Sequence, residues 1–178
     1  SQGRLCRHDS SARCSMTPIY IFDLDGTLAL TGHRQSILDQ KDDPERWRKF
    51  FAACIDDPPN LPVIRTLQSL RRSGAECWIW SGRSDEVRTQ TVDWLQRHGC
   101  FGFPTNVLWA WPFGAPERFK MRSAGDFTPD EKLKFGWLAD LDPPERNRLT
   151  AVFDDRDKVV QMWRENGVPC FQVAKGDF

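Results

Sequence analysis

The fold of this chain is decided by the stretch Ile19-Tyr20-Ile21-Phe22-Asp23-Leu24-Asp25-Gly26-Thr27. Its first four residues are apolar, with β-branched and aromatic side chains, and they predict a buried strand followed by a glycine turn. Asp23 and Asp25 are two positions apart, so on an extended backbone their carboxylates point the same way and can converge on one ligand. A pair of aspartates that only caps the strand and its turn is the alternative interpretation.

Further along the chain, apolar runs alternate with helical patterns. The runs occupy residues 76–81, 106–111, 150–154 and 169–173, and the helical patterns occupy residues 61–72, 85–98 and 157–166. Another helix is predicted to begin at Thr128-Pro129-Asp130-Glu131, with Thr128 as its N-cap residue. This alternation predicts an α/β fold, a Rossmann-like parallel sheet of about five strands flanked by helices. Such sheets bind ligands at the carboxyl ends of their strands, which is where Asp23 lies.

Two segments do not fit the alternation. Residues 28–60 are interpreted as a small inserted cap or lid, with a helix at residues 44–55 whose shared apolar side consists of Trp47, Phe51, Cys54 and Ile55. Residues 112–127 are rich in glycine and proline and are interpreted as a long loop beside the site, which carries Arg118, Lys120 and Arg122.

Length and composition limit the possible functions. A chain of 178 residues fits one domain, assigned to residues 16–178, and its 25 basic and 25 acidic residues exclude a general electrostatic attraction to nucleic acid. No apolar run is long enough for a membrane span. Six cysteines without a C-x-x-C pair favour a reducing, cytoplasmic compartment. The polar residues 1–15 are interpreted as a disordered leader or an artificial extension, with a basic targeting arm as the alternative.

Side chains suited to phosphate and metal follow two other predicted strands. Ser81, Gly82 and Arg83 offer a hydroxyl, backbone amides and a guanidinium to phosphate oxygens, although Ser-Gly after a strand is also an ordinary turn. Asp154 and Asp155 follow a later strand, where two buried acids are costly unless a cation or a hydrogen-bond network neutralises them. For that pair, a capped helix start is the alternative.

Asp130 and Lys134 complete a set of residues that resembles the active-site motifs of the haloacid dehalogenase superfamily. They are four positions apart on the predicted helix and can pair, which alone would be an ordinary surface contact. The set runs in the order D-x-D-G-T, a serine after a strand, a helix lysine and D-D. More narrowly, the chain resembles the 3′-phosphatase domain of phage-type polynucleotide kinase/phosphatases, from Ile19 to its C-terminus.

Four motifs carry the narrower resemblance. They are F-D-L-D-G-T-L-A with Arg34, S-G-R at residues 81–83, G-D followed by D-x-x-x-K at residues 125–134, and D-D-R-D-K-V-V-Q-M-W-R-x-x-G-V-x-C-x-Q-V-A-x-G-D-F at residues 154–178. No G-x-x-x-x-G-K-[ST] phosphate loop occurs, so no kinase domain is expected in this chain. The chain departs from the family pattern mainly at residues 31–60 and 95–124, which leaves the choice of substrate open.

The resemblance implies a Mg²⁺-dependent phosphatase that forms a covalent aspartyl-phosphate. Asp23 would attack phosphorus, while Asp25 would protonate the leaving alkoxide and later activate the hydrolytic water. Mg²⁺ would be held by Asp23, by the backbone carbonyl of Asp25, and by Asp154 or Asp155.

The resemblance also assigns residues to the phosphate group of the substrate. Ser81 would donate a hydrogen bond to a phosphoryl oxygen, and Lys134, held in place by Asp130, would offset negative charge. The residues implied in substrate binding are Thr27, Arg34, Gly82, Arg83 and Asp130.

The substrate itself is less well indicated. The favoured hypothesis is removal of 3′-phosphate from DNA or RNA ends in nucleic-acid end repair, and the alternatives are a phosphatase for nucleotides or other small phosphomonoesters and a non-catalytic end-binding module. The candidates for tracking a nucleic-acid backbone or stacking on a base are Arg118, Lys120, Arg122, Trp47, Trp109 and Trp111, although tryptophans in strands more often belong to the core. His33 and His98 are interpreted as surface residues without partners. No membrane contact is expected, and the sequence does not indicate an oligomeric state.

Overall fold

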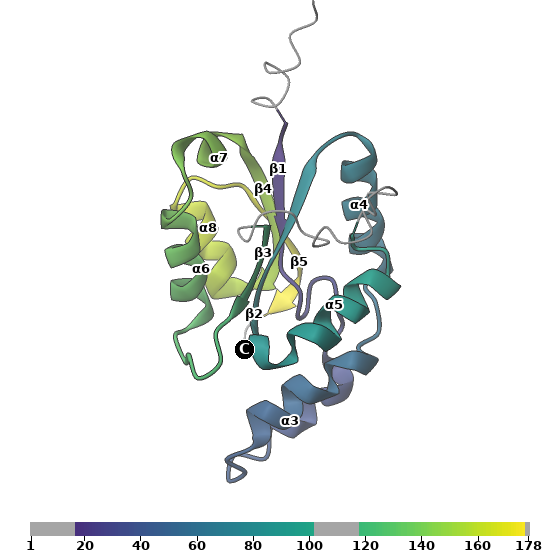
Figure 1. Cartoon of the computed structure of the whole chain (residues 1–178). Coiled ribbons are helices and arrows are strands. Elements are labelled where there is room, and N and C mark those ends of the chain that lie inside the picture. Colours follow the sequence, from purple (N-terminus) through teal and green to yellow (C-terminus); the bar gives the residue numbers. More distant parts are fainter. Residues whose placement is uncertain (1–16, 102–117, 177–178) are drawn as a thin grey trace, which may run out of the picture.

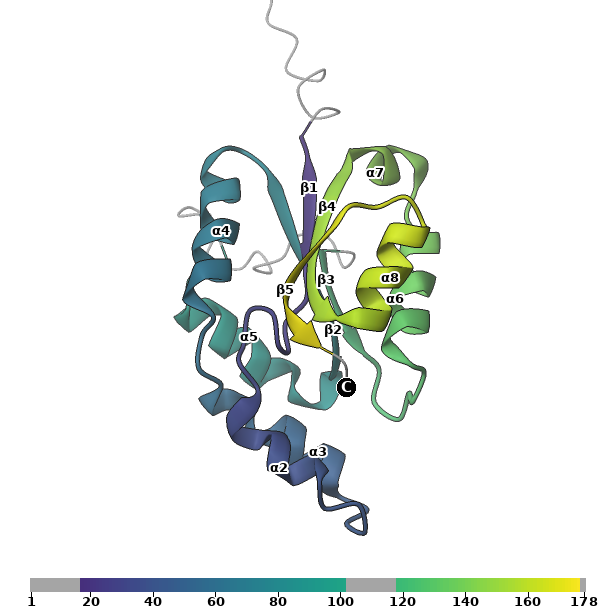
Figure 2. The same cartoon turned by 180° about the vertical axis from the view of Figure 1, so that it is seen from behind.

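The structure of the protein, a computed structural model, describes residues 17–101 and 118–176, which form one five-stranded parallel sheet with helices on both faces (Figures 1 and 2). The strands lie in the order β3-β2-β1-β4-β5, and every neighbouring pair is parallel. Their bounds are β1 Ile19–Phe22, β2 Glu76–Ser84, β3 Phe119–Arg122, β4 Leu149–Arg156 and β5 Cys170–Gly176. The predicted α/β class and Rossmann-like arrangement are therefore confirmed.

The helices divide between the two faces of the sheet (Figures 1 and 2). On one face lie α4 (Leu61–Arg72) and α5 (Arg88–Arg97), with the 3-10 turn η3 (Asp85–Val87) before α5; the other face carries α6 (Asp130–Ala139) and α8 (Asp157–Glu165), and α7 (Pro143–Arg148) leads into β4. Successive side chains of β1 point to opposite faces of the sheet. Phe22 belongs to the hydrophobic cluster of Leu67 and Trp94 on the first face, and Ile21 belongs to the cluster of Trp163 on the second.

Strand register brings the predicted site residues to one edge. Phe22 is opposite Ile79 of β2 and Phe153 of β4, so the residues that follow these three positions lie at the same end of the sheet. The backbone N–H of Asp23 extends this pairing by donating to the carbonyl of Phe153 at 2.9 Å. The polar ends of β1, β2 and β4 therefore meet, as expected for parallel strands.

The third described strand, β3, lies in a segment for which the sequence pattern predicted no strand. The apolar run at residues 106–111, like residues 1–15, lies outside the described residues, and β3 occupies part of the segment interpreted as a loop. Within β3, Phe119 and Met121 are buried, whereas Lys120 and Arg122 are half-buried. This is the alternation of a strand, and the basic side chains between the apolar ones obscured it.

The predicted start of α6 is also wrong in detail. Pro129, with an extended backbone, precedes the first helical residue Asp130, so Thr128 is not the N-cap residue. Instead, the backbone N–H of Thr128 donates to the carboxylate of Asp126 at 2.8 Å, which fixes the loop before the helix. A proline with an extended ψ ends the loop and delays the helix by one residue beyond the predicted start.

Residues 32–56 form a small helical segment beyond the carboxyl ends of the strands (Figures 1 and 2). It consists of η1 (Gly32–Arg34), α2 (Gln35–Leu38), α3 (Arg46–Ala52) and η2 (Ala53–Asp56). Its predicted apolar side is partly wrong, because Phe50 and Cys54 are buried while Trp47 and Ile55 are exposed. The chain changes to a 3-10 turn after Ala52, with three residues per turn, and this shifts the phase of Cys54 and Ile55 relative to α3.

Among the described residues, no helix is both long and apolar enough to span a bilayer.

Candidate active site

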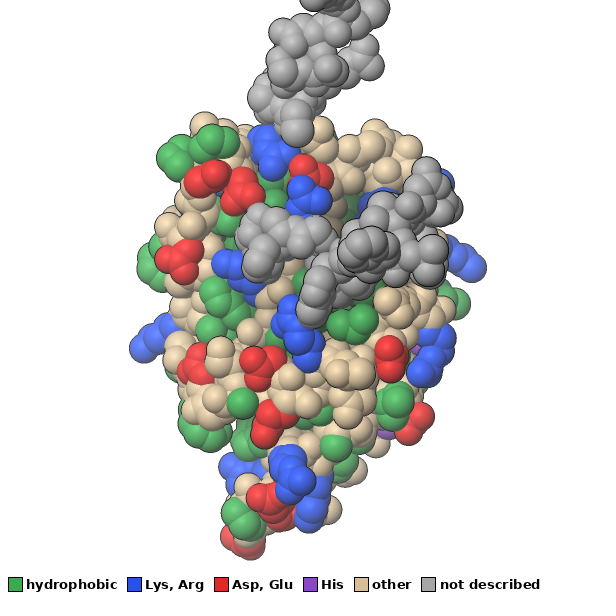
Figure 3. All heavy atoms as spheres, in the orientation of Figure 1, with side chains coloured by type: hydrophobic (Ala, Val, Ile, Leu, Met, Phe, Trp, Pro, Cys, Tyr) green, Lys and Arg blue, Asp and Glu red, His purple; other side chains and the backbone are tan. Residues whose placement is uncertain are grey.

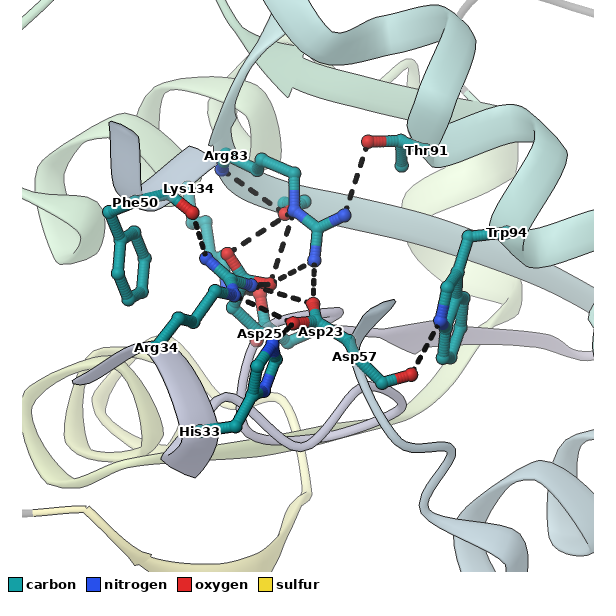
Figure 4. Close-up of polar contacts among 11 residues, drawn as sticks. Asp23, Asp25, His33, Arg34, Phe50, Asp57, Arg83, Thr91, Trp94 and Lys134 are labelled. Carbon is teal, nitrogen blue, oxygen red and sulfur yellow. Dashed lines mark hydrogen bonds and ion pairs between the residues drawn. The ribbon is translucent and has the colours of Figure 1, made fainter. Parts of the chain in front are cut away.

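A buried lysine lies among the carboxylates at the carboxyl edge of the sheet (Figure 4). The Nζ of Lys134, from α6, donates to Asp23 Oδ1 at 2.6 Å and to Asp154 Oδ2 at 2.7 Å. Lys134 and Asp154 are almost completely buried, and Asp23 is 4% exposed. Residues from three separate parts of the sequence thus converge, as the motif order predicts.

Three carboxylates in this cluster could share a cation. Oxygen atoms of Asp23, Asp154 and Asp155 all lie within 4.8 Å of one another, and all three residues are buried. The hydroxyl of Thr27 donates to Asp155 Oδ1 at 3.3 Å and so orients the carboxylate that Lys134 does not bond. Closely grouped carboxylate oxygens are the donor set that Mg²⁺ prefers.

The electrostatics of the cluster also fit a divalent ion. Burial raises the pKa of Asp23 well above its usual value against the opposing effect of Lys134, and burial together with Asp154 raises the pKa of Asp155 to about 6. Burial disfavours the charged form of Lys134, but Asp154 and Asp23 outweigh it and raise the lysine pKa. One lysine cannot balance three ionised carboxylates, so a bound cation would stabilise their charged forms.

A second network surrounds Asp25 (Figure 4). Arg34 donates to Asp25 Oδ1 at 2.8 Å and to both carboxylate oxygens of Asp57 at 2.7 Å, and Arg83 contacts the same two carboxylates. Burial raises the pKa of Asp25, but Arg83 and Arg34 outweigh it and hold that pKa below its usual value. Both arginine side chains are buried, and they anchor Asp25.

Asp57 is a site residue that the sequence analysis missed. Its side chain is buried and bridges Arg34 and Arg83, while its carbonyl accepts the indole N–H of Trp94 at 2.8 Å. In the sequence it was only the residue before Pro58 and Pro59 at a predicted helix end. No motif marks it, because its importance arises from partners 23 and 26 positions away.

The predicted pair between Asp130 and Lys134 is wrong. Lys134 is turned toward Asp23 and Asp154, whereas the Asp130 carboxylate forms ion pairs with Arg122 of β3 and Arg156 of β4. The physical reason is that the carboxylates of Asp23 and Asp154, at the carboxyl edge of the sheet, lie within hydrogen-bonding distance of the buried lysine. Asp130, in the first turn of α6, is left to bind the two arginines.

The serine-glycine segment after Trp80 packs tightly against Asp130. Ser81 is fully buried, and its Oγ accepts the backbone N–H of Arg83 at 3.1 Å. A Cβ atom on Gly82 would lie 2.5 Å from Asp130 Oδ1, so only glycine allows this backbone to approach the carboxylate. The predicted phosphate-binding segment is therefore fixed against α6.

Other predictions about single residues are corrected by the structure. His33 Nε2 lies 3.7 Å from Asp57 Oδ1, and the His98 ring contacts Trp94 with centroids 4.4 Å apart, so neither histidine lacks a partner. Arg118, which precedes β3, pairs with Glu76, and Lys120 of β3 lies over Trp80. Their predicted role along a nucleic-acid backbone stays a prediction. Trp109 and Trp111 lie outside the described residues.

Gly26→Ala is expected to disrupt the acid cluster. Gly26 has φ +89°, and a Cβ atom there would overlap the carboxylate of Asp155. We expect a loss of about 2 kcal/mol or more in the free energy of unfolding and weaker Mg²⁺ binding. Urea denaturation with and without Mg²⁺ measures both effects. Gly74→Ala is the control for backbone strain, because Gly74 has φ +92° but open space around it; equal losses in both variants would contradict the steric argument.

Comparison with known proteins gives the following matches. The family described as the polynucleotide kinase PNKP phosphatase domain matches residues 17–178. A chain in the structure of the Pnkp1/Rnl/Hen1 RNA repair complex is 27% identical, with a TM-score of 0.70, over 98% of this chain and 47% of that chain. A second structure of the Pnkp1/Rnl/Hen1 complex matches at 27% identity, with a TM-score of 0.67, over 91% of this chain and 48% of the other. The chain thus spans about half the length of these relatives.

More distant structures share the fold. The class C acid phosphatase from Bacillus anthracis is 13% identical, with a TM-score of 0.60, over 92% of this chain and 68% of that one. A putative phosphatase from Clostridium difficile is 14% identical, with a TM-score of 0.57, over 88% of this chain and 84% of that one.

Proposed function

The chain belongs to the polynucleotide kinase PNKP phosphatase domain family of haloacid dehalogenase phosphatases, and from this membership we propose that it removes 3′-phosphate groups from polynucleotide ends through a covalent intermediate on Asp23. The observation that carries the proposal is the buried cluster of Asp23, Lys134, Asp154 and Asp155 beside the anchored Asp25. At the carboxyl edge of the sheet, Asp23 would be the nucleophile, the ammonium group of Lys134 would supply positive charge, and Asp25 would transfer the proton.

In the first step, a carboxylate oxygen of Asp23 attacks phosphorus and the bond between phosphorus and the ester oxygen breaks. The leaving alkoxide takes a proton from Asp25 and becomes a free 3′-hydroxyl. In the second step, Asp25 accepts a proton from water as that water attacks the aspartyl-phosphate. Inorganic phosphate leaves, and both aspartates return to their starting states.

Asp25 needs a proton for the first step, yet two arginines hold its pKa low in the free protein. The proposed contacts of Arg34 and Arg83 with the substrate phosphate would change this balance, and they require these buried guanidinium groups to turn partly away from Asp25. If the phosphate dianion takes hydrogen bonds from these guanidinium groups, Asp25 loses part of its positive surroundings and its pKa rises. The ionised form already present in the free protein is the one that the second step requires.

Lys134 and the segment after β2 would position and neutralise the transferred group. Lys134 balances charge on Asp23 and on the phosphoryl oxygens, and the Ser81 hydroxyl donates to a non-bridging oxygen. Gly82 would present its backbone N–H, while Asp130 fixes this segment through Arg122, whose Nε donates to the carbonyl of Gly82 at 2.8 Å. Thr27 would act indirectly, because its hydroxyl donates to Asp155 Oδ1 and orients that carboxylate.

Mg²⁺ is the proposed cofactor, and Asp23, Asp154, Asp155 and the backbone carbonyl of Asp25 are the groups that would hold it. When bound, it would neutralise negative charge on the attacking carboxylate and on the phosphoryl oxygens.

The choice of a polynucleotide substrate is supported by the family and by the RNA repair complex in which the matching relatives are found. The charge of the protein does not favour binding of nucleic acid over a broad surface. Basic and acidic residues are equal in number, and their side chains are interspersed on the described surface shown in Figure 3. We therefore propose that recognition is local and limited to the chain end, and that the protein acts in cytoplasmic nucleic-acid end repair.

The test is a comparison of kcat/KM for 3′-phosphorylated DNA and RNA oligonucleotides with that for 3′- and 5′-mononucleotides, each measured in Mg²⁺ and in EDTA. We expect a preference for one of the oligonucleotides of about tenfold or more, and loss of turnover in EDTA. Equal or better use of mononucleotides would refute the polynucleotide assignment while leaving a phosphatase. A folded protein without turnover on any of these substrates would favour the non-catalytic end-binding module.

A further inference from the structure

Phe127 is the most exposed large hydrophobic side chain that the structure describes. It is 86% exposed, compared with 57% for Phe171 and 47% for Phe135. Single exposed apolar residues are common, so exposure alone indicates nothing. What distinguishes Phe127 is the loop that carries it, at residues 123–129 between β3 and α6, which extends past the same end of the sheet as the helical segment of residues 32–56 (Figures 1 and 2).

The backbone on both sides of Phe127 is fixed by hydrogen bonds. Arg122 donates from one guanidinium nitrogen to the carbonyls of Asp126 and Thr128, at 3.2 and 2.5 Å. The Asp126 carboxylate accepts the Thr128 N–H at 2.8 Å, and the N–H of Ala124 donates to Asp85 Oδ1 at 2.9 Å. The aromatic ring therefore projects from a braced loop, and ordering it costs only the freedom of its own side chain.

The same arginine connects this loop to the proposed phosphate-binding segment. Arg122 also donates to the Gly82 carbonyl and pairs with Asp130, whose carboxylate packs against Gly82. Phe127 is three residues before Asp130, so their Cα atoms are at most about 11 Å apart. Because the Asp130 carboxylate packs against Gly82, the loop that carries Phe127 begins close to the segment where a substrate phosphate would lie in the proposed function.

We propose that Phe127 is a specificity-determining residue that stacks on the base next to the scissile phosphate, so that the preferred substrate has an unpaired base at its 3′ end. The inference rests on the proposed function. An exposed aromatic face suits any base, because every base has a flat π-face, and stacking on a side chain requires a base that is not held inside a duplex. Phe127 therefore favours nucleobase-bearing substrates without selecting a sequence.

The test is a double-mutant cycle between Phe127→Ala and removal of the terminal base. The substrates are a 3′-phosphorylated oligonucleotide and the same oligonucleotide whose terminal sugar carries the phosphate but no base. On the intact substrate we expect Phe127→Ala to raise KM roughly 5- to 150-fold with little change in kcat, because uniform binding energy is lost. On the base-free substrate, the variant and the wild-type protein should have equal KM values.

Phe127→Trp should restore the KM of the wild-type protein, and Phe135→Ala should leave KM unchanged as a control for an exposed phenylalanine outside this loop. Equal KM values for wild-type protein and Phe127→Ala on the intact substrate would overturn the inference. So would an equal rise on both substrates, which would indicate loop damage.

The proposed function and the role of Phe127 can be refuted independently of each other. If the wild-type protein hydrolyses 3′-mononucleotides but not oligonucleotides, the polynucleotide assignment is refuted. The same cycle with a 3′-mononucleotide and a base-free sugar phosphate then still decides whether Phe127 binds the base.

Discussion

Asp23→Asn is expected to lower kcat by at least about 10,000-fold, because the amide oxygen cannot form the aspartyl-phosphate. The fold should survive the change. Asparagine has nearly the same shape and removes a charge whose burial already raises the pKa of Asp23. Lys134 keeps its bond to Asp154 at 2.7 Å, so no buried ion is left without a partner. We expect the free energy of unfolding to change by less than about 2 kcal/mol.

Single-turnover assays on a 3′-phosphorylated oligonucleotide and urea denaturation measure the two quantities. Asp93→Asn is the matched control, because Asp93 is an exposed aspartate on α5. A variant with kcat near the wild-type value would refute the nucleophile assignment. Acid quenching of the wild-type reaction should also trap phosphate on the protein, and the trapped label should be absent from Asp23→Asn.

Lys134→Met is expected to damage both stability and catalysis. It removes the ammonium group that pairs with Asp23 and Asp154, and removing one member of a buried ion pair typically costs about 3–5 kcal/mol. Loss of the charge that balances nucleophile and phosphate should lower kcat by about 100- to 1,000-fold or more.

Thermal unfolding with and without Mg²⁺ separates the two effects. A divalent ion at the carboxylates should restore part of the lost stability of Lys134→Met but none of the lost kcat. Lys132→Met, an exposed position on the same helix, should match the wild-type protein in both measurements. If Lys134→Met is as stable as the wild-type protein in EDTA, the lysine does not neutralise the cluster.

Much of this site could be predicted from the sequence because its residues follow strands. Phe22, Ile79 and Phe153 are neighbours across the sheet, and parallel strands deliver whatever follows them to one edge. Asp23 and Asp154 were found in this way without any knowledge of their distance from each other. Local periodicity also identified the buried faces of α4 and α5, where Leu67 and Trp94 are fully buried.

Pairings between side chains could not be predicted, because they depend on which partners the fold places nearby. Asp130 and Lys134 have ideal spacing for an ion pair, yet each has stronger partners on neighbouring strands. Asp57 was missed for the same reason, since its arginines come from η1 and from the end of β2. Short elements were also difficult: β3 has only four residues and two of them are basic.

The bond between Arg34 and Asp57 has a consequence for how this family can vary. The two residues are 23 positions apart and mark the beginning and the end of the helical segment between β1 and α4, so their contact closes that segment at its base. The free-energy cost of closing such a segment rises only slowly with its length, by about 0.6 kcal/mol for each doubling of the number of residues. Insertions and deletions between these two anchors can therefore accumulate while the atoms around Asp25 stay in place, which makes this part of the gene the natural place for new substrate preferences to evolve.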